Sequence, residues 1–105
     1  MNTVHLDPRH IRTIVEILGQ HPSVEKAAVF GSRALGTQKE ASDVDIVLYG
    51  NVDERTIGRI RNAIDDTTLP YFFDVVSHNS IHQPALLEHI EKHGAVIFER
   101  KTVSL

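Results

Sequence analysis

The sequence predicts a single α/β domain in which helices pack on a mixed sheet of about four strands. Apolar residues recur at helical spacing in some segments and form short continuous runs in others, and the two kinds alternate as α-β-α-β-α-β-α-β. The breaks between them are short and polar, which favours a compact single sheet. A chain of 105 residues can bury one hydrophobic core and has no spare length for a separate recognition domain. We therefore expect residues 1–105 to form one unit.

The first half of the chain begins with a helix expected over residues 8–18. Asp7 suits its N-cap and Pro8 its first turn. A strand is expected over residues 24–30, and residues 32–35 are expected to form a short helical turn. The apolar face of the first helix consists of Ile11, Ile14, Val15 and Leu18.

The second half continues the alternation after a polar stretch, residues 36–42, that is typical of a loop. We expect strands over residues 43–49, 71–76 and 95–98. Helices are expected over residues 53–64, with Asp53 as N-cap, and over residues 84–93, with Gly94 as the stop. Residues 101–105 are expected to be a frayed tail.

Composition excludes several functional classes. The formal net charge of −3 argues against a large basic surface for nucleic acid, so we expect no direct nucleic-acid binding. Cysteine is absent, which excludes a disulfide framework and a thiolate zinc site. No apolar run approaches the length of a membrane span, and the N-terminus lacks a signal-peptide core. We expect a cytoplasmic protein without a membrane partner.

The stretch from Gly31 to Asp45 carries the chemistry. Asp43 and Asp45 stand at i and i+2 on a predicted strand, so their side chains project from the same face. Each carboxylate disfavours ionisation of the other unless a cation lies between them. Carboxylate oxygens of this kind suit Mg²⁺, which commonly shares its coordination with substrate phosphates.

The dipeptide Gly31-Ser32 supplies a complementary feature. Glycine allows close approach of the backbone, and N–H groups at the start of a helix attract anions. A metal clamp and a phosphate-binding turn in one short stretch indicate phosphoryl or nucleotidyl transfer. Simpler interpretations exist for each residue: Asp43 could end a turn, Asp45 could cap a strand edge, and Ser32 could be only an N-cap.

The spacing of these residues resembles a known family signature. Gly31-Ser32 is followed after ten residues by Asp43-x-Asp45, and Asp74 appears later inside an apolar segment. This pattern is similar to that of the polymerase-β-like nucleotidyltransferase superfamily, and the resemblance implies the palm fold of that superfamily, a mixed sheet with helices packed on it. It most resembles the minimal members, the MNT antitoxins encoded beside HEPN toxins. Many relatives carry a basic residue where this chain has Leu35, which removes a side chain that could contact phosphate there.

The resemblance implies a role for each site residue. Asp43, Asp45 and Asp74 would be the metal-binding and catalytic carboxylates, with Asp74 accepting the proton of the attacking hydroxyl. Two Mg²⁺ ions about 3.5–4 Å apart would stabilise the incoming and leaving oxygens. ATP would be the co-substrate, held at its β- and γ-phosphates by Gly31 and Ser32. Arg33 is a further candidate for contacting phosphate or partner, although it could instead pair with a surface acid.

The resemblance also implies a partner. The chain would transfer AMP from ATP to a hydroxyl, expected to be a tyrosine, of a HEPN-type RNase toxin and so silence it. Two alternatives stay open. One is an enzyme that modifies a small-molecule hydroxyl, although relatives of that sort carry an added helical domain. The other is a catalytically silent toxin-binding module, which would have no need of three clustered carboxylates.

Histidines and aromatic residues offer weaker signals. The pairs His78/His82 and His89/His93 have the i, i+4 spacing that can bind zinc on a helix. No Glu follows His78 in the metalloprotease pattern, so structural or exposed histidines are the favoured interpretation. Residues 71–73 are expected to belong to the core and its rim, with an adenine contact as the alternative.

Overall fold

A four-stranded sheet with strand order β3-β2-β1-β4 organises the computed structural model, which describes residues 3–37 and 43–100. Strand β1 pairs antiparallel with β2 and with β4, whereas β2 and β3 are parallel. The predicted mixed sheet and the alternation of helices and strands are confirmed. Parts of the expected loop (residues 38–42) and the expected tail (101–105) lie outside the described residues. In chain order the elements are α1 (Pro8–Gly19), β1 (Lys26–Phe30), α2 (Ser32–Leu35), β2 (Val44–Tyr49), α3 (Glu54–Asp65), β3 (Phe73–Ser77), the 3-10 turn η1 (His78–Ser80), α4 (Pro84–His93) and β4 (Ala95–Glu99).

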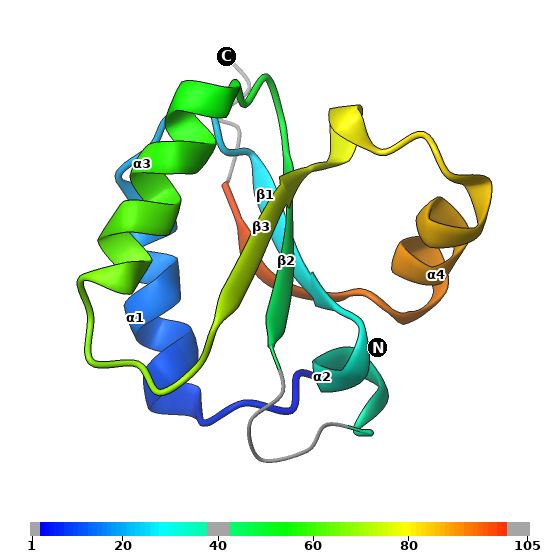
Figure 1. Ribbon diagram of the computed structural model, residues 1–105, viewed down its shortest axis with the longest axis horizontal. Helices are drawn as coiled ribbons and strands as arrows, with labels where there is room; N and C mark the ends of the chain where they lie inside the picture. Colours follow the sequence, from blue (N-terminus) through cyan, green and yellow to red (C-terminus); the bar gives the residue numbers. More distant parts are fainter. Residues whose placement is uncertain (1–2, 38–42, 101–105) are drawn as a thin grey trace.

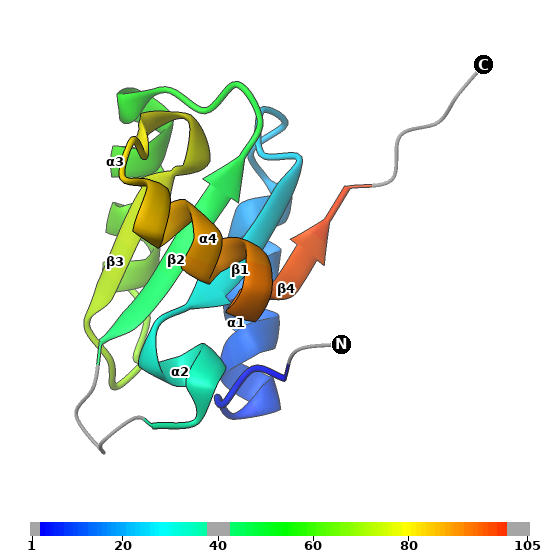
Figure 2. The same ribbon diagram turned by 90° about the vertical axis from the view of Figure 1, so that its right-hand side faces the viewer.

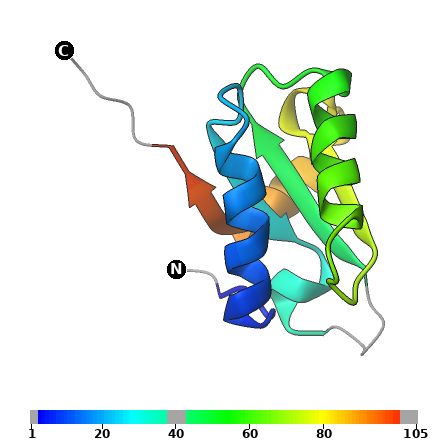
Figure 3. The same ribbon diagram turned by 90° about the vertical axis from the view of Figure 1, so that its left-hand side faces the viewer.

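The helices divide between the two faces of the sheet. Figure 3 shows α1 and α3 side by side across one face, and Figure 2 shows α4 crossing the other. The larger hydrophobic core lies under α1 and α3, and a smaller one lies under α4. None of the described helices is long and apolar enough to cross a bilayer. The smaller core consists of Ala28, Phe30, Val47 and Ile90, with Tyr49, Val76, Ile81 and Leu86 packed against it.

Two aspartates begin the long helices, as the sequence predicted. The side chain of Asp7 accepts the backbone N–H of Arg9 at 2.9 Å, and that of Asp53 accepts the N–H of Thr56 at 2.8 Å. Hydrogen bonds from Arg9 hold the pKa of Asp7 well below its usual range. The pKa of Asp53 is lowered by the hydrogen bonds from Thr56. Each carboxylate therefore satisfies an N–H group that has no partner within the helix.

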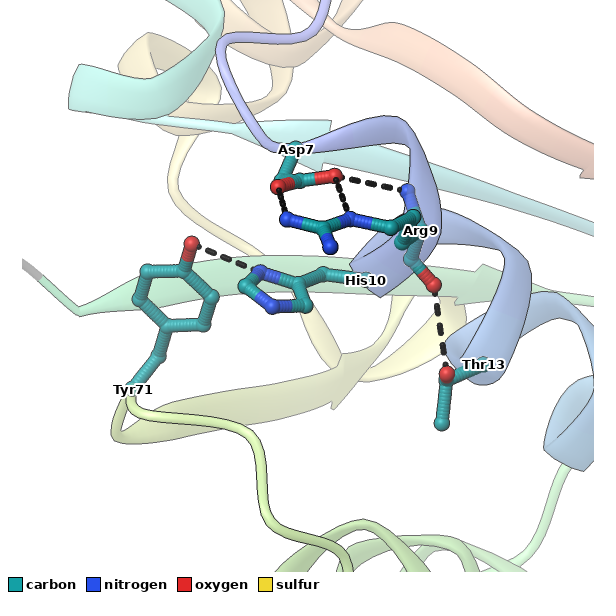
Figure 4. A network of polar contacts seen from close by, with 5 residues as sticks. All are labelled: Asp7, Arg9, His10, Thr13 and Tyr71. Atoms are coloured by element: carbon teal, nitrogen blue, oxygen red, sulfur yellow. Dashed lines mark hydrogen bonds and ion pairs between the residues drawn. The ribbon is translucent and has the colours of Figure 1, made fainter.

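Tertiary contacts move two strand boundaries away from their predicted positions. Strand β3 begins at Phe73, because Tyr71 turns away to contact α1: its hydroxyl lies 2.9 Å from Nδ1 of His10 (Figure 4). Strand β1 begins at Lys26, because the N–H of Val24 is bonded within a turn to the carbonyl of His21. The turn η1 was not predicted.

Alternation along β2 assigns its side chains to the two faces. Val44, Ile46 and Leu48 belong to the core under α1 and α3. Asp45 therefore projects to the opposite face, which carries Val47 and α4. Helix α4 covers only part of that face (Figure 1).

Candidate active site

The aspartates lie at the edge of the sheet that is formed by the first residues of β2 and β3. Asp45 is the register partner of Asp74 in the parallel β2–β3 pair. Partners in neighbouring strands share a face of the sheet, so Asp45 and Asp74 both lie on the α4 side. Asp43 lies just before β2 begins, and its charge acts on Asp45. This is the arrangement on which the predicted chemistry depends.

Gly31 approaches these carboxylates from the end of β1. Its φ of 72° and ψ of −149° are favourable only for glycine. A Cβ atom at this position would lie 2.5 Å from Oδ2 of Asp45. The missing side chain thus allows the Gly31-Ser32 turn and the Asp45 carboxylate to stand against each other.

The electrostatics of Asp45 reflect this crowding. Burial raises the pKa of Asp45, and the charges of Asp74 and then Asp43 raise it further. The half-buried carboxylate consequently resists ionisation at this edge of the sheet. Among the described residues, no group of three or more His, Asp or Glu side chains converges closely enough to hold a metal ion. The charges of Asp74 and Asp43 act on Asp45, but the three carboxylates do not form a closed cage.

Asp74 differs from its predicted environment. Apolar residues flank Asp74 in the sequence, a pattern typical of a buried strand, and an unpaired carboxylate buried in this way would be costly without a cation. In the structure β3 is an edge strand and Asp74 is exposed. The argument from burial is therefore wrong, because water solvates this carboxylate. Its placement opposite Asp45 rests on register alone.

Helix α2 starts from Gly31 itself. The Gly31 carbonyl accepts the N–H groups of Ala34 and Leu35, each at 3.1 Å. Gly31 is the N-cap residue and Ser32 is the first helical residue, so the interpretation of Ser32 as an N-cap is wrong. Leu35 is exposed on this helix.

The comparison with known proteins identifies the family. The model of the family described as Polymerase beta, Nucleotidyltransferase matches residues 12–103. The chain belongs to this nucleotidyltransferase family. The predicted superfamily is thereby confirmed.

Two relatives from Methanocaldococcus jannaschii show the likeness within this nucleotidyltransferase family. "Putative protein adenylyltransferase MJ1217" is 33% identical over 84 residues, which cover 78% of this chain and 85% of that protein. "Putative protein adenylyltransferase MJ0435" is 36% identical over 80 residues, which cover 75% and 84%.

Solved structures share the fold of this nucleotidyltransferase. A toxin–antitoxin crystal structure with AMP-PNP aligns with a TM-score of 0.71 and 21% identity, over 87% of this chain and 74% of that one. A complex of the tri-AMPylated Shewanella oneidensis HEPN toxin with its MNT antitoxin aligns with a TM-score of 0.66 and 17% identity, over 88% and 71%. At these identities the likeness shows the fold.

Arg33 lies buried between α2, the N-terminal segment and Tyr71. The side chain is only 6% exposed. Its guanidinium carbon lies 4.8 Å from the centre of the Tyr71 ring, and Nη1 donates to the carbonyl of His5 at 3.4 Å. Arg33 therefore ties α2 to the N-terminal segment and to Tyr71. Contact of Arg33 with phosphate or with a partner stays a prediction.

The aromatic residues before and within β3 follow the core-and-rim prediction. Tyr71 and Phe73 pack half-buried against the larger core, and Phe72 is 79% exposed. The Phe72 carbonyl accepts the N–H of Val44 at 2.8 Å, which closes the β2–β3 pair next to the aspartates.

The sequence gave little information about the roles of the histidines, but one of them, His89, contacts the candidate site. His78 begins η1 and His82 follows that turn, so they do not share a helix. His89 and His93 both lie on α4, with ring centres 5.4 Å apart. His89 contacts the Gly31 turn, which sequence reasoning missed: the contact joins residues 58 positions apart. The sequence favoured a structural or exposed histidine over a zinc ligand at this position, and it did not indicate which residue His89 contacts.

Proposed function

We propose that this chain is a Mg²⁺-dependent nucleotidyltransferase that transfers AMP from ATP to a hydroxyl of a partner protein. The observation that supports this most directly is the alignment of Asp45 with Asp74 beside Gly31 at one edge of the sheet. Membership of the nucleotidyltransferase family supports the reaction class. The names of the two archaeal relatives support a protein as acceptor.

The donor set fits Mg²⁺ even without a closed cage of three side chains, because this ion commonly takes one or two protein carboxylates together with waters and substrate phosphates. The carboxylates at this edge offer oxygen ligands, which hard divalent cations prefer. The raised pKa of Asp45 marks accumulated negative charge that a cation would offset. Asp43 and Asp45 would hold the ion, and Asp74 would complete the set. Bound Mg²⁺ would supply neutralisation of the phosphates and of the leaving pyrophosphate.

The protein residues then have separate tasks in the transfer. The turn formed by Gly31 and Ser32 holds the β- and γ-phosphates beside the aspartates. The acceptor oxygen attacks the α-phosphorus, its new bond forms as the bond to pyrophosphate breaks, and Asp74 takes the hydroxyl proton. Asp74 suits this step because it is exposed and can reach an acceptor presented from solution. Catalysis in such transfers is mainly positioning and charge stabilisation, which a small domain can provide.

The partner that we propose is a HEPN-type RNase toxin, modified on a tyrosine and thereby neutralised. Two structures that share this fold are toxin–antitoxin assemblies, and one contains a tri-AMPylated HEPN toxin. These assemblies support the proposal that this chain acts as an antitoxin and that a partner protein presents the hydroxyl.

The experiment incubates the protein with ATP labelled at the α-phosphate, Mg²⁺ and the product of the neighbouring gene. Label on a tyrosine of that partner is the expected result. Asp45→Asn should lower the rate about 10³-fold, because several kcal/mol of charge stabilisation are lost. The matched control is Asp66→Asn, which removes the same charge from the exposed end of α3 and should transfer at the wild-type rate.

Other outcomes would change the assignment. Label found only on a small molecule such as an aminoglycoside would identify a small-molecule transferase. Neutralisation of the partner without any label would identify a silent binding module. Equal rates of AMP transfer by the Asp45→Asn variant and the wild type would show that Asp45 is not a metal ligand.

A further inference from the structure

His89 reaches the nucleotide-binding turn from the opposite side of the smaller core. The backbone N–H of Gly31 donates to Nε2 of His89 at 3.0 Å. Nε2 must therefore be unprotonated, and in the neutral ring Nδ1 carries the hydrogen. The His89 ring also meets the ring of Phe30 edge-on, with centres 6.4 Å apart. The histidine is thus fixed against the last residue of β1 and against the turn that follows it.

Gly31 is held by three separate elements of the fold. Helix α4 takes its N–H through His89, and α2 begins from its carbonyl. Its Cα faces the Asp45 carboxylate so closely that no side chain would fit between them. A rotation of the peptide bond before Gly31 would therefore change both the direction of α2 and the contact with Asp45.

We propose that His89 is a positioning residue, which fixes the conformation of the Gly31-Ser32 turn by accepting the Gly31 N–H. This inference rests on the proposed function for its catalytic consequence. It also changes the role of Gly31: its N–H is committed to His89, so the phosphates would be contacted by other groups of the turn. The geometry needs a neutral acceptor, because a protonated imidazole has no lone pair to offer.

Packing holds His89 in place independently of this hydrogen bond. Its neighbour Ile90 is 3% exposed and anchors α4 in the smaller core. Replacement of the half-buried His89 should therefore leave α4 seated on the sheet. The contact can be removed without unfolding the element that carries it.

The test compares three variants. His89→Ala removes the acceptor, whereas His89→Gln restores one, because the amide oxygen of Gln reaches about as far as Nε2 of His. His93→Gln is the matched control: this exposed residue lies one helical turn away. We expect kcat for AMP transfer to fall about 10–100-fold in His89→Ala, to recover to within about threefold in His89→Gln, and to stay at the wild-type value in His93→Gln.

Nuclear magnetic resonance tests the contact without relying on activity. In the wild type we expect the ¹⁵N shift of an unprotonated Nε2 and a coupling across the Gly31 N–H···Nε2 hydrogen bond. In His89→Ala the Gly31 amide signal should move and exchange faster with solvent. In His93→Gln it should not.

The outcomes separate this inference from the proposed function. A wild type that transfers nothing to any partner would overturn the proposed function, while the coupling would still decide whether His89 holds the turn. Absence of the coupling, with Nε2 protonated, would overturn the inference even in an active enzyme. Equal loss of kcat in His89→Ala and His89→Gln would also overturn it, since the acceptor atom would then be irrelevant.

Discussion

At the scale of single residues, the Asp45 carboxylate has opposite effects on stability and on cation binding. Burial and the charges of Asp74 and Asp43 raise its pKa, so the ionised carboxylate destabilises the metal-free protein. The same crowding prepares the site for a divalent cation. A residue that lowers stability without its ligand is common at functional sites.

The first prediction concerns the stability of metal-free Asp45→Asn. Because the folded-state pKa of Asp45 is raised, its carboxyl is tolerated when protonated and becomes unfavourable as pH rises through the unfolded value and then the folded one. The variant should therefore be more stable than the wild type at pH 7. The gain should stay below about 1 kcal/mol, since solvent screens a half-exposed group, and it should vanish near pH 3. Urea unfolding in chelator across this range measures the difference, and a less stable variant at pH 7 would contradict the prediction.

The second prediction concerns Gly31→Ala. Alanine is strained at a φ of 72°, and its Cβ would lie 2.5 Å from a carboxylate oxygen of Asp45. We expect a loss of about 1–3 kcal/mol in the free energy of unfolding, together with loss of AMP transfer.

Gly58→Ala is the matched control for this substitution. Gly58 lies inside α3 with open space around it. Alanine there should stabilise by about 0.5–1 kcal/mol, because glycine is unfavourable within a helix. Denaturant titration of both variants distinguishes local strain from a general effect of added methyl groups, and equal stability changes would refute the assignment of strain to Gly31.

The site residues differ in how well their place in the structure could be predicted from the neighbouring sequence. Gly31, Asp43, Asp45 and Asp74 stand at strand ends with diagnostic spacing, so their shared edge was predictable. Arg33 and His89 have no such context, because the partners that define them lie far along the chain. The contact of Arg33 with the Tyr71 ring, for example, could not be predicted from the residues that flank Arg33.

At the scale of elements, capping explains why the helices begin where they do. Asp53 accepts the Thr56 N–H at the start of α3, a type of contact visible in sequence as an acidic residue before an amphipathic run. The first residues of β1 and β3 could not be predicted from such a local signal. They depend on where His21 and Tyr71 find partners, which only the packed molecule determines.

The third prediction concerns this cap. Asp53→Ala should lower Tm by about 3–6 °C at pH 7, because one N–H at the start of α3 loses its acceptor. The pKa of Asp53 is lowered in the folded state, so its contribution is present above the unfolded pKa and is lost as pH falls through the folded one. Asp53→Asn keeps an acceptor and should stay near the wild type. Thermal unfolding at several pH values checks both; a drop in Tm for Asn as large as for Ala would mean that charge, and not the cap, matters.

At the scale of the whole molecule, one face of the sheet is used mainly for packing and the other carries the candidate site. The face under α1 and α3 carries most of the buried side chains. The other face is covered in part by α4 (Figure 1), and it carries the smaller core, Asp45 and Asp74. Composition and periodicity predicted a mixed sheet with helices packed on it. The parallel pairing of β2 with β3 brings Asp74 level with Asp45. This pairing depends on tertiary packing, and no local sequence pattern specifies it.

The last prediction follows from this division. ATP with Mg²⁺ should bind at the open edge without disturbing the larger core, and it should raise the free energy of unfolding by mass action. At a ligand concentration 100 times Kd the gain is about 2.7 kcal/mol, which for a domain of this size raises Tm by roughly 10–20 °C. A thermal shift assay with Mg²⁺ alone, ATP alone and both together measures it. Chelator or Asp45→Asn should abolish the shift, whereas Asp66→Asn should retain it. A shift of equal size in Asp45→Asn would mean that nucleotide binds away from the aspartates, because a site built on their charge cannot lose it without losing affinity.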